Sequence, residues 1–229
     1  MPTAAAPADT PALNAVVAEL AALDDPRMRA VNQRHGDDHG VNLTGLRALA
    51  KRLKTRHDLA LELWDTGNTD ARLLALLICR PRAFTPGQLD AMLRQIAAPK
   101  LLDWFVTHAV KPGPHAEPLR QAWKDDPAEY VAAAGWALTV ARVVKQPEGL
   151  DLDALLDEIE AGLKTAPARK QWSMNHCLAE IGIHSPPHRA RALAIGETLQ
   201  VLADYPTSPG CTSPYAPAWI GEMVRRREG

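Results

Sequence analysis

The sequence predicts an all-α fold, because most of the chain repeats its apolar residues at the spacing of a helix. In segment after segment the residues at i, i+3, i+4 and i+7 are apolar, which places them on one helical face. Tyr and Phe, which favour strands, number only 3 and 2. No run alternates apolar and polar residues over the length of a strand. These observations disfavour any class that contains a sheet.

The length and composition predict one folded domain over residues 12–229. The chain has 229 residues, of which 46% are hydrophobic and 23% charged, enough for one continuous core. Residues 1–11 are rich in Ala and Pro and lack both a basic and an apolar region, so we expect a flexible tail there and not a signal peptide. No stretch is long and apolar enough to span a membrane.

Charge and cysteine content narrow the function classes. The formal net charge of -1 provides no overall basic field, so binding to nucleic acid requires a local basic patch. Cys79, Cys177 and Cys211 form no CxxC pair and are too few for a disulfide framework. This favours a reducing compartment, and we expect a cytoplasmic protein.

Caps and turns separate the helical segments of the first half of the chain. The predicted elements are a helix with Leu13, Val16, Val17 and Leu20 that ends near Asp24, a segment to His35, a helix over 43–53 capped by Asn42 or Thr44, and two helices that meet at the turn 65–68. Between them, His35, Asp37, Asp38 and His39 suggest a metal site. The neighbouring glycines and the lack of matching ligands favour a solvated turn instead.

Two caps mark helix starts in the middle of the chain. Thr85-Pro86-Gly87-Gln88 is a capping box with Pro at the first helical position, and Asp126 is predicted to cap a helix in the same way. The remaining predicted helices lie near residues 89–97, 100–110, 117–124, 130–144, 152–163, 168–181, 189–202 and 216–226.

The helix around residues 171–184 has two distinct faces. Its apolar stripe contains Met174, Cys177, Leu178 and Ile181. About half a turn away lie Trp172, Asn175, His176 and Ala179, a face that suits a ligand. In the alternative interpretation, Trp172 packs beneath the next helix and Asn175 caps a loop.

Successive antiparallel helix pairs predict an α-α superhelix. About a dozen short helices with short connections indicate repeats of roughly 40 residues, near the period of HEAT and armadillo repeats. Stacked repeats present a long concave surface that binds extended ligands such as nucleic acid or peptide. A globular helical bundle is the alternative.

Several segments resemble the bacterial DNA alkylation repair (AlkD-like) HEAT-repeat family. In the first half of the chain these segments are His39-Gly40-Val41, residues 46–51, residues 61–64, Asn68, and residues 71–72 and 74–76. In the second half they are residues 134–138 and Trp172-Ser173-Met174-Asn175. The resemblance implies an α-superhelix that wraps duplex DNA. In active members of the family, it also implies metal-free, monofunctional excision of cationic 3- and 7-alkylpurines.

The resemblance also identifies a catalytic segment. Active members carry a Trp-Asp-x-x-Asp motif, which corresponds here to residues 102–106. The first Asp is Asp103, but the second, catalytic Asp falls on Val106 and the Trp falls on Leu102. Asp103 and Trp104 are therefore the catalytic candidates, one supplying the carboxylate and the other an aromatic surface. Alternatively, Asp103 is a cap or ion-pair partner and Trp104 belongs to the core.

Later helices supply the candidate DNA contacts. These are Trp136, Arg142, Lys145, Lys170, Trp172 and Asn175. Lys and Arg at helix ends suit phosphates, whereas ordinary solvated side chains are the alternative. Metal or nucleophile sites that join Cys211 to His176, His184 or His188 are disfavoured because no paired ligand or base is fixed nearby.

The sequence therefore predicts a monomeric protein that binds duplex DNA without a metal or other cofactor, and the family resemblance implies that alkylated DNA is included. Two functions follow. The first is a glycosylase that releases N3- or N7-alkylpurines, and the second is a non-catalytic scaffold that binds DNA or protein.

Overall fold

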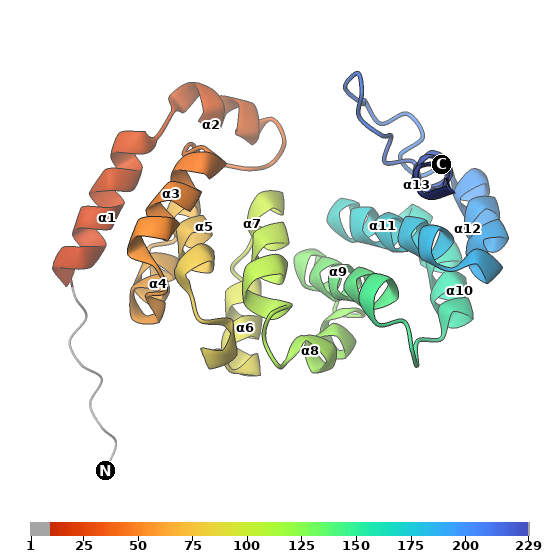
Figure 1. Ribbon diagram of the computed structural model, residues 1–229, viewed down its shortest axis with the longest axis horizontal. Coiled ribbons are helices and arrows are strands. Elements are labelled where there is room, and N and C mark those ends of the chain that lie inside the picture. The colour runs from red at the N-terminus through yellow and green to blue at the C-terminus, as the bar shows by residue number, and fades with distance from the viewer. Residues whose placement is uncertain (1–9, 229) are drawn as a thin grey trace, which may run out of the picture. The chain divides into compact units, whose positions relative to one another are not determined.

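The computed structural model describes residues 10–228, and these residues form helices joined by loops, with no β-strand among them (Figure 1). The predicted all-α class is confirmed. Helix α1 begins at Thr10, so the helix includes Thr10 and Pro11, which had been assigned to the tail; the rest of the predicted tail lies outside the described residues. No helix in the described part of the chain has the length and apolar character that a membrane crossing requires.

The chain divides into two compact units, one up to Ala116 and one from Glu117 onward. The first contains α1 (Thr10–Leu23), α2 (Pro26–Gln33), α3 (Leu43–Leu53), α4 (His57–Asp65), α5 (Thr69–Ile78), η1 (Pro81–Ala83), α6 (Pro86–Leu93), α7 (Pro99–Trp104) and the π-helical η2 (Phe105–Val110). The second contains α8 (Ala116–Trp123), α9 (Glu129–Lys145), α10 (Leu152–Gly162), η3 (Leu163–Thr165), α11 (Ala168–His184), α12 (Pro186–Leu199) and α13 (Ala216–Glu228). A single domain over 12–229 remains a prediction.

The core of the first unit is centred on α5. This helix is buried on nearly every face, because α3 and α4 both pack against it and α7 and η2 lie on a further side. Its run of Leu and Ala residues explains this position, since a helix that is apolar on all sides is stable only when surrounded. Arg72 is the exception on this helix, and its guanidinium stacks over the ring of Trp64 at 5.0 Å.

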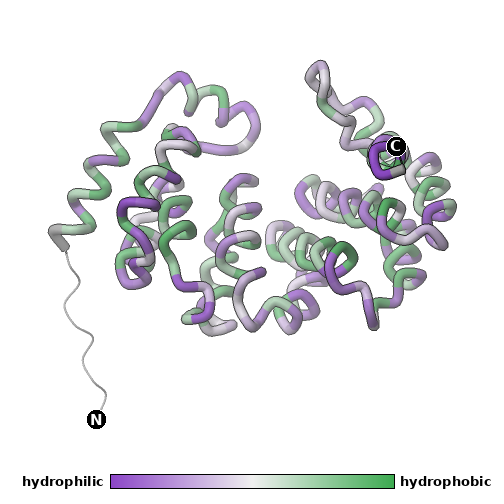
Figure 2. The backbone as a smooth tube through the Cα atoms, in the orientation of Figure 1, coloured by the Kyte–Doolittle hydropathy of each residue, from purple (hydrophilic) through white to green (hydrophobic). Residues whose placement is uncertain are grey.

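The core of the second unit is centred on the contact between α9 and α11, the most extensive helix contact in the structure. Helix α9 is hydrophobic along most of its length (Figure 2). Gly135 on α9 faces the end of α8, where an added Cβ would lie 2.3 Å from the backbone nitrogen of Lys124. Glycine therefore permits a backbone approach that any larger residue would prevent.

Two of the three predicted caps are confirmed. The Asn42 side chain accepts a hydrogen bond from Gly45 N, and Thr85 and Gln88 form the complete capping box. The prediction for Asp126 is wrong, because α9 begins only at Glu129. Asp126 instead accepts a bond from Ala128 N and stabilises the turn before the helix. An Asx turn and a helix cap share the same sequence pattern, so the residues alone do not separate them.

The turn after α2 is only partly the solvated turn that the sequence predicted, because His35 and Asp38 are exposed but the two other polar residues are not. Asp37 and His39 are buried, and only 9% and 4% of their surfaces are exposed. Asp37 Oδ1 accepts a hydrogen bond of 2.7 Å from Lys100 N at the start of α7. Asn32 donates 2.8 Å to the His39 carbonyl oxygen. The polar residues of this turn therefore satisfy backbone groups inside the first unit.

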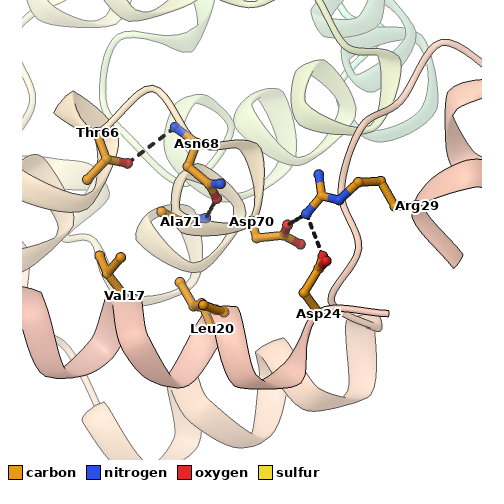
Figure 3. Close-up of a pocket in the computed structure, with 9 residues that line it drawn as sticks. Val17, Leu20, Asp24, Arg29, Thr66, Asn68, Asp70 and Ala71 are labelled. Carbon is orange, nitrogen blue, oxygen red and sulfur yellow. Dashed lines mark hydrogen bonds and ion pairs between the residues drawn. The ribbon is translucent and has the colours of Figure 1, made fainter. Parts of the chain in front are cut away.

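Asp70, at the start of α5, fixes the same turn from the opposite side. Its carboxylate is 2% exposed and accepts hydrogen bonds from Gly40 N at 3.1 Å and Val41 N at 2.9 Å. Arg29 donates to Asp70 Oδ2 at 2.9 Å and also pairs with Asp24, as Figure 3 shows beside a cavity of about 260 Å³. One buried carboxylate thus joins α2, the turn and α5.

We predict that Asp70→Ala lowers the free energy of unfolding by about 2–4 kcal/mol, because two buried N–H groups and one guanidinium lose their acceptor. Urea unfolding followed by circular dichroism measures this change. Asp65→Ala, at the exposed end of α4, is the matched control and should change stability by less than about 0.5 kcal/mol. Equal effects of the two substitutions would contradict the structural role of Asp70.

Candidate nucleic-acid interface

The segment that the resemblance marks as catalytic lies on α7 and η2, and most of it is core. Leu102 and Val106 are 1% and 2% exposed, so the positions that correspond to the motif's Trp and catalytic Asp point into the first unit. Asp103 lies on the exposed side of α7. The only carboxylate of the motif therefore faces solvent, while the position of the second is filled by an apolar side chain.

Trp104 is 7% exposed, and its ring already has two neighbours. The Arg47 guanidinium lies 5.3 Å from the ring centroid, and the His108 ring meets it edge-on at 5.3 Å. Cation–π and edge-to-face contacts are both favourable for an indole. The structure thus matches the alternative in which Trp104 is a packed residue.

The helix predicted over residues 100–110 changes its winding after Trp104. From Phe105 to Val110 it is π-helical, and Lys111 N donates 2.9 Å to Val106 O, five residues back. A π-turn holds more residues than an α-turn and shifts the faces of all following side chains. The α-helical spacing that the sequence analysis assumed therefore does not hold beyond Trp104.

Trp136 is a core residue of the second unit. Its side chain is completely buried, and Lys124 Nζ lies 5.1 Å from its ring centroid. Lys124 is in turn paired with Glu158 at 2.6 Å. Because no part of the indole is exposed, Trp136 has no aromatic face that DNA can contact in this structure. The predicted direct contact is not compatible with this burial.

The basic candidates differ in how they are held. Arg142 Nη2 donates 3.0 Å to the Glu148 carbonyl, and its Nε lies 3.6 Å from Glu117. The pKa of Glu117 is lowered, chiefly because Arg120 donates hydrogen bonds to its carboxylate. Burial acts in the opposite direction, and the positive charges of Arg120 and Arg142 add to the lowering. The carboxylate of Glu117 therefore offsets part of the positive charge of Arg142. Lys145 is exposed in the last turn of α9, and Lys170 is half-buried in the first turn of α11.

Asn175 and Trp172 fix the irregular segment that precedes α13. Asn175 is 2% exposed and donates 2.8 Å to the Pro214 carbonyl, so the alternative in which it caps a loop matches the structure. Trp172 meets Tyr205 edge-on, with ring centroids 5.4 Å apart. The two residues hold the segment at both ends.

These contacts border an open, aromatic-lined cavity of the second unit. It has a volume of about 350 Å³ and is lined by Trp172, Tyr205, Pro206, Thr207, Ser208, Cys211, Thr212, Pro214 and Trp219. The sequence analysis identified Trp172 but missed Tyr205 and Trp219. The sequence feature that could have indicated them is the longest irregular segment of the chain, which carries an aromatic residue near each end. Its prolines restrict its backbone.

A cluster of charged and polar side chains from α11 and α13 lies beside this cavity. Glu180 is 3.2 Å from His176 and 3.1 Å from His184, and Arg227 contacts His184 at 3.0 Å. Burial opposes ionisation of Glu180, but the hydrogen bond from His176 and the nearby positive charges outweigh it and lower its pKa. The His176 ring stacks on Trp219 with centroids 4.9 Å apart, which orients one wall of the cavity.

The cysteines differ in reactivity. Burial raises the pKa of Cys79 to about 11 and that of Cys177 to about 12, so both thiols stay protonated at neutral pH. Cys211 is exposed and lines the aromatic cavity. Within residues 10–228, no three His, Cys, Asp or Glu side chains are grouped in a way that would hold a metal.

Comparison with known proteins gives a consistent family relationship. The family model described as DNA alkylation repair enzyme matches residues 16–220. Uncharacterised proteins of Listeria innocua and Listeria monocytogenes are each 24% identical, and each match covers 91% of this chain and 95% of the relative.

A solved structure shares the fold with a TM-score of 0.79 over 94% of each chain, at 21% identity. It is described as "a new family of proteins related to the HEAT-like repeat DNA glycosylases with affinity for branched DNA structures". This similarity confirms the predicted class of HEAT-like helical repeats.

The environment of His108 predicts a pH dependence of stability. Burial, assisted by the charge of Arg47, lowers the pKa of His108, so the folded state disfavours its protonation. Above the ordinary His pKa of about 6.5, His108 is neutral in both the folded and the unfolded state, and its protonation costs no stability. As the pH falls below this value the unfolded state binds the proton first, so the free energy of unfolding decreases. We expect wild-type stability to fall between about pH 7.5 and about pH 5, and less steeply in His108→Gln.

Urea unfolding across this pH range measures the effect, and His35→Gln, at an exposed position, is the control substitution. A His108→Gln profile as steep as that of the wild type would show that His108 is not responsible.

Proposed function

The chain belongs to the DNA alkylation repair enzyme family, and from this premise we propose that it binds DNA at distorted or branched sites without excising a base. The affinity for branched DNA that the description of the structural relative names supports this choice of DNA. We further propose that the protein acts as a cytoplasmic monomer and needs no cofactor.

The observation that carries the proposal is the apolar filling of the catalytic positions. Cleavage of the bond between sugar and base builds positive charge on the sugar, which a nearby carboxylate stabilises. At the corresponding position Val106 is 2% exposed, and Leu102 before it is 1% exposed. Neither side chain is ionisable, and both are buried.

Binding itself needs only phosphate contacts and an aromatic surface. Within residues 10–228 the ammonium groups of the predicted contacts Lys145 and Lys170 form no ion pair, whereas the charge of Arg142 is partly offset by Glu117, 3.6 Å away. Contacts of this kind are independent of sequence and sensitive to salt. Trp172 and Asn175 act through the aromatic cavity that they build, which is consistent with a protein that recognises DNA structure.

One observation favours a second function. Asp103 lies on the exposed side of α7, where a carboxylate is accessible to a sugar. If Asp103 replaces the missing acid, the protein is a glycosylase that releases cationic N3- or N7-alkylpurines from duplex DNA. Trp104, packed beside it, would then position the helix.

A single experiment separates these functions. Protein in excess is mixed with duplex that contains 7-methylguanine, the bound fraction is measured by fluorescence anisotropy, and free base is measured in the same sample. We expect bound DNA and no release above the spontaneous rate. Release by the wild type that is lost in Asp103→Asn would support the glycosylase and overturn the proposal.

Val106→Asp provides a further test with the same assay. Because Val106 is in the core, we expect the new carboxylate to lower stability by about 2–5 kcal/mol without producing release. Thr107→Asp, at the exposed neighbouring position, is the matched control. A stable Val106→Asp variant that releases base would show that the position faces the DNA and had only lost its acid.

A further inference from the structure

The aromatic cavity of the second unit has the composition of a binding site for a flat, uncharged group. Three of its walls are the aromatic rings of Trp172, Tyr205 and Trp219. None of its lining residues is Asp, Glu, Lys or Arg, so the cavity offers no cationic side chain to a phosphate. Its volume of about 350 Å³ is within the range of small-molecule sites, which are mostly apolar with a few polar groups.

The polar groups of the cavity are hydroxyls from one segment. Thr207, Ser208 and Thr212 contribute them, and hydroxyls both donate and accept hydrogen bonds. The edge of a nucleobase carries both donors and acceptors, while its faces stack on aromatic rings. Aromatic faces combined with neutral hydroxyls therefore match a base better than they match a sugar phosphate or an aliphatic chain.

The segment that carries these hydroxyls is held in place without a ligand. Asn175, which is buried, donates to the Pro214 carbonyl at 2.8 Å, and Cys211 N donates 3.0 Å to the Ser208 carbonyl. Tyr205 is 44% exposed even though it contacts Trp172. A large aromatic side chain kept this exposed in a fixed segment is available for stacking.

The backbone before the segment is also unusual. Gln200 and Leu202 have φ angles of 54° and 60°, in the left-handed region that residues other than glycine and asparagine seldom adopt. Such conformations persist only where surrounding contacts enforce them. Here they turn the chain from α12 toward Tyr205, and so bring its ring to Trp172.

We propose that this cavity takes up one unpaired nucleobase, which stacks on the exposed ring of Tyr205, contacts Trp172 beside it, and meets the hydroxyls of the segment with its edge. The inference rests on the proposed function for the source of the base, since branched DNA exposes bases that a continuous duplex keeps paired. Asn175 is a positioning residue that acts through Pro214. Stacking of one base typically changes affinity by roughly 5- to 150-fold.

The test uses a forked DNA with 2-aminopurine at an unpaired position, because stacking on an aromatic ring quenches its fluorescence. We expect quenching by the wild type, and a loss of affinity of roughly 5- to 150-fold with little quenching for Tyr205→Ala. Trp172→Ala should act in the same direction and Trp172→Phe should restore binding. Tyr130→Ala, on α9 outside the cavity, is the matched control.

Because Tyr205 is substantially exposed, Tyr205→Ala should fold even if Trp172→Ala does not. Binding of the fork with no quenching, and with full affinity in Tyr205→Ala, would overturn the inference and leave the proposed function intact.

A second probe, tetrathymidylate, separates the two ideas. If the fork is not bound but tetrathymidylate quenches the protein's tryptophan fluorescence in a way that Tyr205→Ala abolishes, the proposed function fails and the cavity is still a base site. If neither DNA has any effect, both fail.

Discussion

The burial of one face of α11 against α9 is the constraint on which the second unit depends. Met174, Cys177, Leu178 and Ile181 are all at most 2% exposed, which fixes the rotation of the helix about its axis. With that face buried, Asn175 can reach Pro214 and Trp172 can meet Tyr205. A helix that rotated freely would not hold the irregular segment. The core of the unit and the shape of its cavity are therefore one arrangement.

The same principle explains why two of the family's motif positions in the first unit are apolar. Helix α7 and η2 use Leu102, Phe105 and Val106 as core residues against α5. An acid at position 106 would need either a partner or solvent, and the structure provides neither in the core. A buried apolar side chain therefore lies where active family members carry the acid, while the fold of the described relative is retained.

Periodicity predicted the helices well because each needs an apolar face to be stable, and the stripe of α11 is an example. It failed where polar residues serve the backbone. Asp37 looked like part of a solvated turn because its donor partner, Lys100 N, lies more than sixty residues away in the sequence. The π-turn after Trp104 also left no sequence signal, since its winding depends on packing.

The candidate site was predictable only in part, for the same reason. Trp172 and Asn175 stood out as a polar and aromatic face on a helix; Trp172 lines the cavity, and Asn175 holds the lining residue Pro214 from behind. Trp136 stood out equally, but it is fully buried beneath Lys124. A sequence shows which tryptophans share a helical face, whereas the neighbour that covers the face is set by tertiary packing.

The most direct test of this account is the ratio of dissociation constants for a three-way junction and for a linear duplex of the same sequence and length. The ratio is measured by competition at one salt concentration, because phosphate contacts depend strongly on salt. Recognition of DNA structure predicts clearly tighter binding to the junction. Equal affinity for the two DNAs, or no affinity for either, would contradict it.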